Sequence, residues 1–174
     1  MAEPAVSTLL IMAGVALLAA VLTRRLPKRA GRAARAQRAV VCLVSGDRLL
    51  VMQGDGPLEL PKGRIKKNER PLTAAHRECF EESGLRPSSL SPLTTLRVQR
   101  GKQGRRETWA VFWGPLPDVT VPFEHRVTGK GKDRGRQYHF TLTPVYALDA
   151  HTLRPPLGDV LPALRRQLTA LQVR

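Results

Sequence analysis

Three glutamates at helical spacing are the clearest chemical feature of the sequence. Glu78, Glu81 and Glu82 lie within Gly63–Leu85 (GRIKKNERPLTAAHRECFEESGL), at positions i, i+3 and i+4. On a helix with 100° per residue, the three carboxylates share one narrow face. Like charges at these spacings repel each other by roughly 0.2–0.5 kcal/mol per pair. A solvated helix face usually mixes its signs, so this pattern indicates a bound cation.

The cation that three carboxylates favour is a hard divalent metal. Mg²⁺ prefers carboxylate and water ligands, and Mn²⁺ accepts the same set. Divalent metals held by carboxylates commonly activate water against a phosphoryl group. We therefore predict a Mg²⁺ site, with Mn²⁺ as the alternative, and a reaction at phosphorus. An acidic helix face that merely balances a basic protein is the competing interpretation.

The same segment resembles the Nudix box, whose pattern is G-x5-E-x7-R-E-U-x-E-E-x-G-U, with U a bulky apolar residue. The pattern is matched by Gly63, Glu69, Arg77, Glu78, Glu81, Glu82, Gly84 and Leu85. Cys79 stands at the first U position, where it is smaller than the usual aliphatic residue. The resemblance implies an α/β fold, a Nudix-type α/β/α sandwich with a mixed sheet, and a Mg²⁺-dependent hydrolase of diphosphate linkages. The alternative is a non-catalytic Nudix module that binds polyphosphate or RNA.

The resemblance also implies roles for individual residues of the box. Glu78, Glu81 and Glu82 would be metal ligands and catalytic residues. Gly63 would let the loop backbone turn and would present a carbonyl towards the metal. Arg77 would be a further catalytic residue, which pairs with an acidic residue and orients the helix.

Two further glutamates take supporting roles in the same interpretation. Glu69 would steady the loop before the helix. Glu124 lies 42 residues beyond Glu82 and would supply an extra metal ligand or the general base. Glu78 is the other candidate for the general base, because family members place this role variably.

The elements that must position these residues follow from the hydrophobic patterning. Strands are predicted at 39–45, 48–53, 58–60, 94–100, 107–114 and 138–148, and helices at 71–83 and 159–172. Pro71 suits the first turn of the earlier helix, and Gly84 suits the left-handed residue after its end. Leu72, Ala75 and Cys79 form the predicted buried stripe of this helix, beside the glutamates.

Composition restricts both the class of protein and the class of partner. The chain has 174 residues, 42% of them hydrophobic, which suits one globular domain, and two cysteines cannot build a disulfide framework. The formal net charge of +15 favours an anionic partner. Aromatic residues make up only 5%, so nucleic acid is a less favoured partner than a phosphorylated small molecule.

A concentration of basic residues predicts where such a substrate binds. Residues 97–139 contain ten Lys and Arg against four Asp and Glu, and glycine-containing loops are expected at about 100–106 and 128–136. The predicted substrate-binding residues are Lys62, Arg64, Arg105, Arg106, Lys130 and Lys132. This basic frame suits a highly anionic substrate, such as a nucleoside polyphosphate, a dinucleoside polyphosphate or a diphosphoinositol polyphosphate.

The N-terminal residues have a different character from the rest of the chain. An 18-residue apolar stretch at 5–22 contains no charge and no proline, and as a helix it would span about 27 Å. Seven basic residues follow within 24–38. We predict a membrane anchor at 1–23, a basic juxtamembrane linker at 24–38 and the Nudix domain at 39–174, on the cytoplasmic side by the positive-inside rule. An organelle-targeting segment and a soluble cytoplasmic protein are the alternatives.

Overall fold

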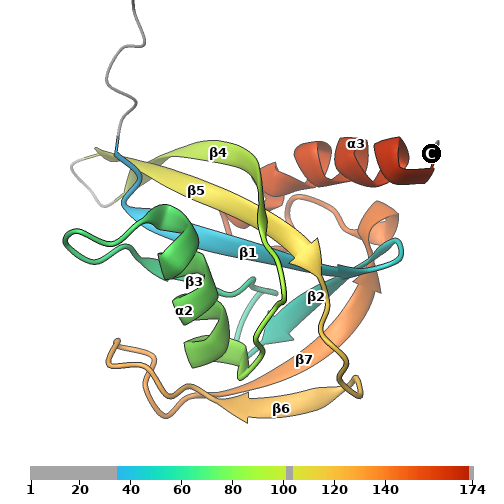
Figure 1. Ribbon diagram of the computed structural model, residues 1–174, viewed down its shortest axis with the longest axis horizontal. Coiled ribbons are helices and arrows are strands. Elements are labelled where there is room, and N and C mark those ends of the chain that lie inside the picture. Colours follow the sequence, from blue (N-terminus) through green and yellow to red (C-terminus); the bar gives the residue numbers. More distant parts are fainter. Residues whose placement is uncertain (1–34, 101–103, 173–174) are drawn as a thin grey trace, which may run out of the picture. The chain divides into compact units, whose positions relative to one another are not determined.

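The computed structural model describes residues 35–100 and 104–172 (Figure 1). Ala34–Arg174 forms one compact unit of the chain. The predicted membrane anchor at 1–23 lies outside the described residues, as does most of the predicted linker at 24–38. Among the residues that are described, no helix combines the length and the apolar character that a membrane span requires.

A seven-stranded mixed sheet forms the centre of this unit. Its strands are β1 (Arg38–Ser45), β2 (Arg48–Gln53), β3 (Lys62–Arg64), β4 (Ser91–Arg100), β5 (Arg105–Pro115), β6 (Phe123–Arg126) and β7 (Gln137–Pro144). The order is β4-β5-β1-β2-β7-β6, with β3 paired to β1. β1 and β5 are parallel, and the other strand pairs are antiparallel. The sheet is therefore mixed, as the sequence predicts.

Two helices cover opposite faces of the sheet, and the alternation of side chains along β1 shows this directly. Ala39, Val41 and Leu43 pack in one core with α2 (Pro71–Ser83), which lies in front of the sheet in Figure 1. The intervening residues of β1 pack in a second core with α3 (Leu161–Gln172). Successive side chains of a strand point to opposite faces. The layers are therefore helix, sheet and helix, the predicted α/β/α arrangement.

The bounds of α2 agree with the prediction because they are set by local chemistry. Pro71 stands at the first helical position, and Gly84 has a φ of 74° with its N–H donated to the Phe80 carbonyl. The predicted buried stripe is wrong in one position, because Leu72 is 41% exposed. The buried face of the helix is centred on Glu78 and Glu82, so these glutamates face the sheet rather than lying beside the apolar stripe.

Three further predictions of secondary structure differ from the structure, and one strand was not predicted. Residues 58–60 contain isolated bridges, and the strand in this region is β3, a few residues later. β6 was not predicted from its short sequence, FEHR. β7 ends at Pro144, which has no N–H for a continued ladder, and a 3-10 helix, Val145–Ala147, follows. The last helix begins at Leu161, after a 3-10 turn at Leu157–Val160.

Candidate active site

Arg77 joins three parts of the chain through one guanidinium group. It makes a two-pronged ion pair with Glu69, with Nε to Oε1 at 2.8 Å and Nη2 to Oε2 at 2.9 Å. Its Nη1 also donates to Glu78 at 2.5 Å and to Glu81 at 3.3 Å. Its Nη2 donates to the main-chain carbonyl of Arg64 at 2.9 Å. The expected pairing of Arg77 with an acidic residue is therefore present, and it ties α2 to β3 and to the loop between them.

The ion pair with Glu69 fixes the charge of both partners. The hydrogen bond from Arg77 lowers the pKa of the Glu69 carboxyl to about 2, and the same bond raises the pKa of Arg77. Glu69 also accepts the main-chain N–H of Lys66 at 2.8 Å. Both side chains are charged at neutral pH, so the loop is held to the helix by a charge-assisted contact.

Gly63 is required by the close approach of Glu78 rather than by a turn. It lies inside β3, and a Cβ at this position would fall 1.9 Å from Glu78 Oε2 and 2.0 Å from its carboxyl carbon. Next to it, the N–H of Lys62 donates to Glu82 Oε2 at 2.9 Å. The loop-turn role expected for Gly63 is thus corrected: only glycine leaves room for the carboxylate against the backbone of β3.

Burial of the two glutamates leaves their charges poorly compensated. Glu78 and Glu82 are 8% and 6% exposed. Burial raises the pKa of Glu82 to about 8, although the Lys62 cation and N–H oppose the shift. Burial also raises the pKa of Glu78, against the effect of Arg77. Carboxylates buried without full compensation fit a divalent cation, whose charge would restore the balance.

The side chains do not themselves form a closed ligand cluster. Within the described part of the chain, no three His, Cys, Asp or Glu side chains form a group that could hold a metal ion. Arg77 holds Glu78 and Glu81, whereas Glu82 turns to the main chain of Lys62. The donor set of three glutamates with the adjacent β3 backbone is nevertheless all oxygen, the type that Mg²⁺ and Mn²⁺ prefer.

The loop between β6 and β7 is seated on the C-terminal half of α2. The N–H of Thr128 donates to the Glu81 carbonyl at 3.0 Å. A Cβ on Gly129 would lie 2.5 Å from Glu81 Oε2, so this glycine permits a close contact. The sequence indicated a flexible loop here and missed both contacts. Lys130 and Lys132, two of the predicted substrate-binding residues, are exposed on this loop.

One other predicted site residue, Glu124, has partners away from the glutamates. Glu124 is exposed on β6 and contacts Gln137 and His139 of the neighbouring strand β7. The next residue, His125, points the other way and packs against Gly84 at the end of α2. The structure therefore does not bring Glu124 to the three glutamates, and we do not include it in the proposed metal site.

The remaining predicted basic residues have three different surroundings. The ammonium group of Lys62 is paired with Glu59, which also binds Arg154 at 2.7 Å. Arg64 and Arg105 line a cavity of about 270 Å³ with three further cations. Arg106 is exposed on β5 and does not line this cavity. Both Arg105 and Arg106 lie on the strand itself rather than in the predicted loop.

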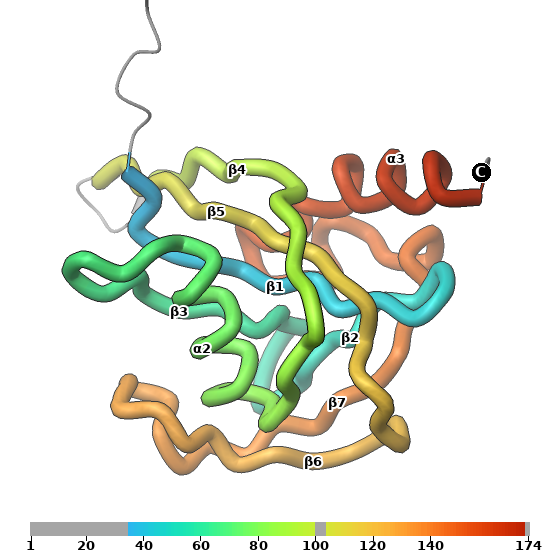
Figure 2. The backbone as a smooth tube through the Cα atoms, viewed as in Figure 1, coloured from blue at the N-terminus to red at the C-terminus, as the bar shows by residue number. Residues whose placement is uncertain are grey.

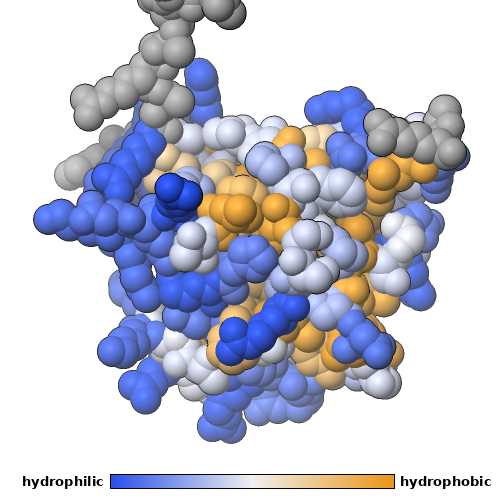
Figure 3. Space-filling model, viewed as in Figure 1, coloured by the Kyte–Doolittle hydropathy of each residue, from blue (hydrophilic) through white to orange (hydrophobic). Residues whose placement is uncertain are grey.

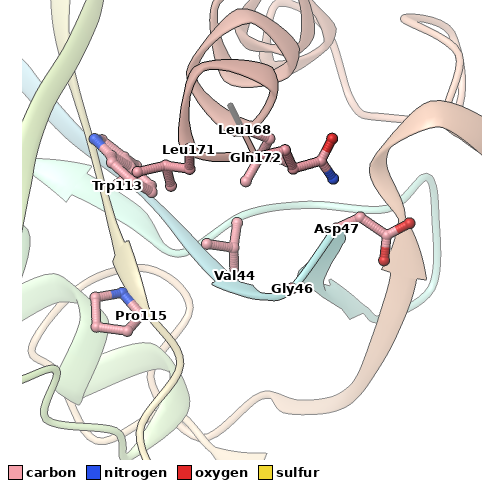
Figure 4. A pocket seen from close by; sticks show the side chains of 8 residues that line it. All are labelled: Val44, Gly46, Asp47, Trp113, Pro115, Leu168, Leu171 and Gln172. Atoms are coloured by element: carbon pink, nitrogen blue, oxygen red, sulfur yellow. The ribbon is translucent and has the colours of Figure 1, made fainter. Parts of the chain in front are cut away.

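A larger cavity of about 530 Å³ lies at the C-terminal end of β1 and is mainly apolar (Figure 4). Val44, Trp113, Leu168 and Leu171 point towards its interior. Among the residues that the structure describes, Asp47 is its one charged lining residue. This cavity is unsuited to a phosphorylated ligand, so the candidate site is the glutamate face of α2.

Comparison with known proteins matches a region of the chain that includes α2 and its glutamates. A family model described as the NUDIX domain matches residues 35–163. The MutT NUDIX hydrolase of Burkholderia pseudomallei superimposes with a TM-score of 0.57 at 18% identity, covering 72% of this chain and 95% of that chain. The Bacillus subtilis pyrophosphohydrolase BsRppH gives 0.56 at 17%, covering 80% and 87%.

A third similar structure is a complex with ADP ribose. The NUDIX domain of Shewanella oneidensis NrtR, complexed with ADP ribose, gives a TM-score of 0.55 at 15% identity, covering 86% of this chain and 97% of that chain. No curated protein matches the chain in sequence. At these low identities the structural likeness establishes only the fold. The family model shows that residues 35–163 form the domain.

Proposed function

The chain belongs to the Nudix family of hydrolases, which act on phosphoric anhydride bonds, and we propose that it is a Mg²⁺-dependent pyrophosphohydrolase of a highly anionic substrate. The observation that carries the proposal is the burial of Glu78 and Glu82 against the backbone of β3, beside Glu81. A buried pair of carboxylates on one helix face is unfavourable without a cation.

The residues of the chain have separate tasks in the proposed reaction. Glu78, Glu81 and Glu82 would hold the metal, and Mn²⁺ would fit the same donors. When bound, the metal supplies a Lewis acid for the phosphoryl oxygens and lowers the pKa of water. Arg77 orients the carboxylates of Glu78 and Glu81 and joins α2 to the Arg64 carbonyl. A carboxylate must also accept the proton of the attacking water, and Glu78 is our candidate for this base.

The distribution of positive charge supports a substrate with several phosphates. Lys130 and Lys132 are exposed on the loop that is seated on Glu81. Cations next to a metal site neutralise phosphate charge that the metal leaves uncovered. We propose a nucleoside polyphosphate, a dinucleoside polyphosphate or a diphosphoinositol polyphosphate as the substrate class.

The test is a chromatographic assay of substrate loss and product formation on these three classes and on ADP-ribose, with Mg²⁺, with Mn²⁺ and with EDTA. We expect turnover that EDTA abolishes and that Glu82→Gln lowers by about a hundredfold or more, since a bound metal contributes several kcal/mol to the transition state. Asp118→Asn removes an exposed carboxylate between β5 and β6 and should retain full activity. Undiminished turnover in Glu82→Gln would refute the metal site, and no turnover on any substrate would favour a binding module.

We further propose that residues 1–23 anchor the protein to a membrane and leave the Nudix domain in the cytoplasm. The support is the uncharged stretch at 5–22 followed by seven basic residues. Carbonate extraction of membranes tests this, comparing the full chain with a variant lacking 1–23. The full chain should stay in the pellet and the shortened chain should be released; equal solubility would refute the anchor.

A further inference from the structure

A basic cavity lies at the start of β1, outside the glutamate face. It has a volume of about 270 Å³ and is lined by residues 35–37, residues 64–67, Arg105 and Glu107. Its lining contains five cations, which are Arg35, Arg64, Lys66, Lys67 and Arg105. We call this cavity the basic pocket. In Figure 3 the hydrophilic surface gathers on the left side, where the loop after β3 lies in Figures 1 and 2.

Hydrogen bonds of the main chain hold the walls of the basic pocket in place. The N–H of Gln37 donates to the Thr108 carbonyl at 2.7 Å, and the Gln37 carbonyl accepts the N–H of Ile65 at 3.0 Å. One residue thereby joins the β5 wall to the β3 wall. The β3 wall is also fastened to α2, because Arg77 donates to the Arg64 carbonyl. Arg64 and Arg105 therefore project from strands that are joined through Gln37, whereas Lys66 and Lys67 lie in the loop that follows β3.

Within the described residues, the positive charges of the basic pocket exceed the negative charge that lines it, five cations to one carboxylate. In the part of the chain that the structure describes, none of the five cationic side chains makes an ion pair. The single lining carboxylate, Glu107, accepts the indole N–H of Trp109 at 2.9 Å and lies 3.6 Å from Arg38 Nε. Five like charges around one cavity repel each other, and an anionic group would relieve this repulsion.

The basic pocket is adjacent to the glutamates in the chain but lies across the strand from them. Gly63 faces the Glu78 carboxylate, and Arg64, the next residue of β3, points to the opposite face. Arg64 pairs with Arg38 of β1, which in turn is in register with Trp109 of β5. An anion in the basic pocket would thus lie across β3 from the proposed metal site, at the next residue of the same strand.

We propose that the basic pocket binds a phosphate group of the substrate that is not cleaved, and so selects substrates with phosphates beyond the scissile diphosphate. The inference rests on the proposed function. Guanidinium groups present paired N–H donors that match phosphate oxygens, and Arg64 and Arg105 contribute two of them from opposite walls. A lipid headgroup carries the same phosphate chemistry, so the experiment includes a membrane arm.

The experiment compares two substrates in one double variant. Arg64→Gln with Arg105→Gln should raise KM about tenfold for a diphosphoinositol polyphosphate, which is about 1.4 kcal/mol of binding. The same variant should change KM for ADP-ribose less than twofold, because this diphosphate has no further phosphate. Arg97→Gln with Arg166→Gln removes the same charge from exposed sites on β4 and α3 and should change neither KM. Thermal unfolding of each variant checks the fold.

Three outcomes would overturn the proposal. An equal rise in KM for both substrates would make the two arginines general supports of the active site. Unchanged KM values would show that substrate does not reach the basic pocket. Unchanged KM values together with weaker binding to phosphatidylinositol-phosphate vesicles would assign the pocket to a lipid headgroup instead.

The failure of the proposed function would be visible separately. In that case the wild-type chain would hydrolyse none of the substrates, ADP-ribose included. Calorimetric titration with inositol hexakisphosphate would then test the basic pocket without turnover. About tenfold weaker binding in the Arg64/Arg105 double variant alone would support the pocket, and equal binding by all three proteins would overturn it.

Discussion

Arg77 and Arg64 lie on two sides of the short strand β3, and their guanidinium groups have opposite surroundings: carboxylates around Arg77 and cations around Arg64. The guanidinium of Arg77 contacts three carboxylates, Glu69, Glu78 and Glu81. The guanidinium of Arg64 lines a pocket with four other cations, and the one lining carboxylate is engaged by Arg38 and Trp109. We infer that Arg77, whose donors are occupied by carboxylates, stabilises the structure of the site. Arg64, which lies among other cations, is available to bind an anionic ligand.

The largest expected effect is the contrast between losing these two arginines. Arg77→Met would leave three carboxylates without their partner, which we expect to lower the free energy of unfolding by about 3 kcal/mol. Arg64→Met removes an exposed side chain but keeps the main-chain carbonyl that Arg77 binds, so its effect should stay within about 0.5 kcal/mol. Urea unfolding at pH 7 measures both. Similar losses in the two variants would contradict the division into scaffold and ligand-binding arginines.

The next effect concerns Glu82, whose charge is the least compensated on the acidic side. Because burial raises its pKa to about 8, the ionised form is unfavourable in the folded protein above the ordinary pKa of a glutamate. Glu82→Gln keeps an acceptor for the Lys62 N–H and removes the charge, so without metal it should be more stable by about 2 kcal/mol at pH 8.

Added Mg²⁺ should reverse this order of stability. A ligand at a hundred times its Kd stabilises the folded protein by about 2.7 kcal/mol, and only the wild type retains all three glutamates. Thermal unfolding with EDTA and with Mg²⁺ measures the two differences. A destabilised Glu82→Gln in EDTA would show that the buried charge is compensated by the protein itself.

A smaller effect should appear in acid, where the contact between Arg77 and Glu69 is lost. The folded-state pKa of Glu69 lies near 2, below its ordinary value, so its stabilising effect is complete above about pH 5 and declines as the pH falls towards 2. We expect Glu69→Gln to lower the free energy of unfolding by about 1.5 kcal/mol at pH 7 and by much less at pH 3. Denaturant unfolding at the two pH values tests this; a constant difference would exclude the ion pair as its source.

The sequence predicted the parts of this comparison that depend on local pattern. Pro71 and Gly84 fix the ends of α2 through their own backbone chemistry, and the spacing of Glu78, Glu81 and Glu82 fixes their common face. The resemblance to the Nudix box, which the family match confirms, added the pairing of Arg77. These features involve residues close in the chain, so one sequence is sufficient to find them.

The remaining features depend on contacts between residues that are distant in the chain. Arg64 and Arg105 meet because β3 and β5 both pair with the start of β1, and nothing near either residue indicates that pairing. The reason for Gly63 was also hidden, since the carboxylate that it admits comes from α2. Leu72 was placed on the wrong face because periodicity alone does not show which side of a helix meets the sheet.

The smallest expected effect separates two glycines on the loop between β6 and β7. A Cβ on Gly129 would lie 2.5 Å from Glu81 Oε2 and 3.3 Å from Glu81 Cβ, whereas a Cβ on Gly131 would meet nothing within 4 Å. Both positions have a backbone that alanine can adopt. Gly129→Ala should therefore displace either Glu81 or the loop and lower kcat/KM about tenfold, which is about 1.4 kcal/mol. Gly131→Ala should change kcat/KM less than twofold.

The two alanine variants leave every charge of the loop in place, so they separate its position from its charge. If kcat/KM falls equally in both, the loop acts through its flexibility and the contact with Glu81 is incidental. If it falls in Gly129→Ala alone, the loop is part of the scaffold although it carries two exposed lysines. The β6–β7 loop would then combine the structural role of Arg77 with the ligand-binding role proposed for Arg64. Its backbone is fixed to the acidic helix, and Lys130 and Lys132 remain exposed for a ligand.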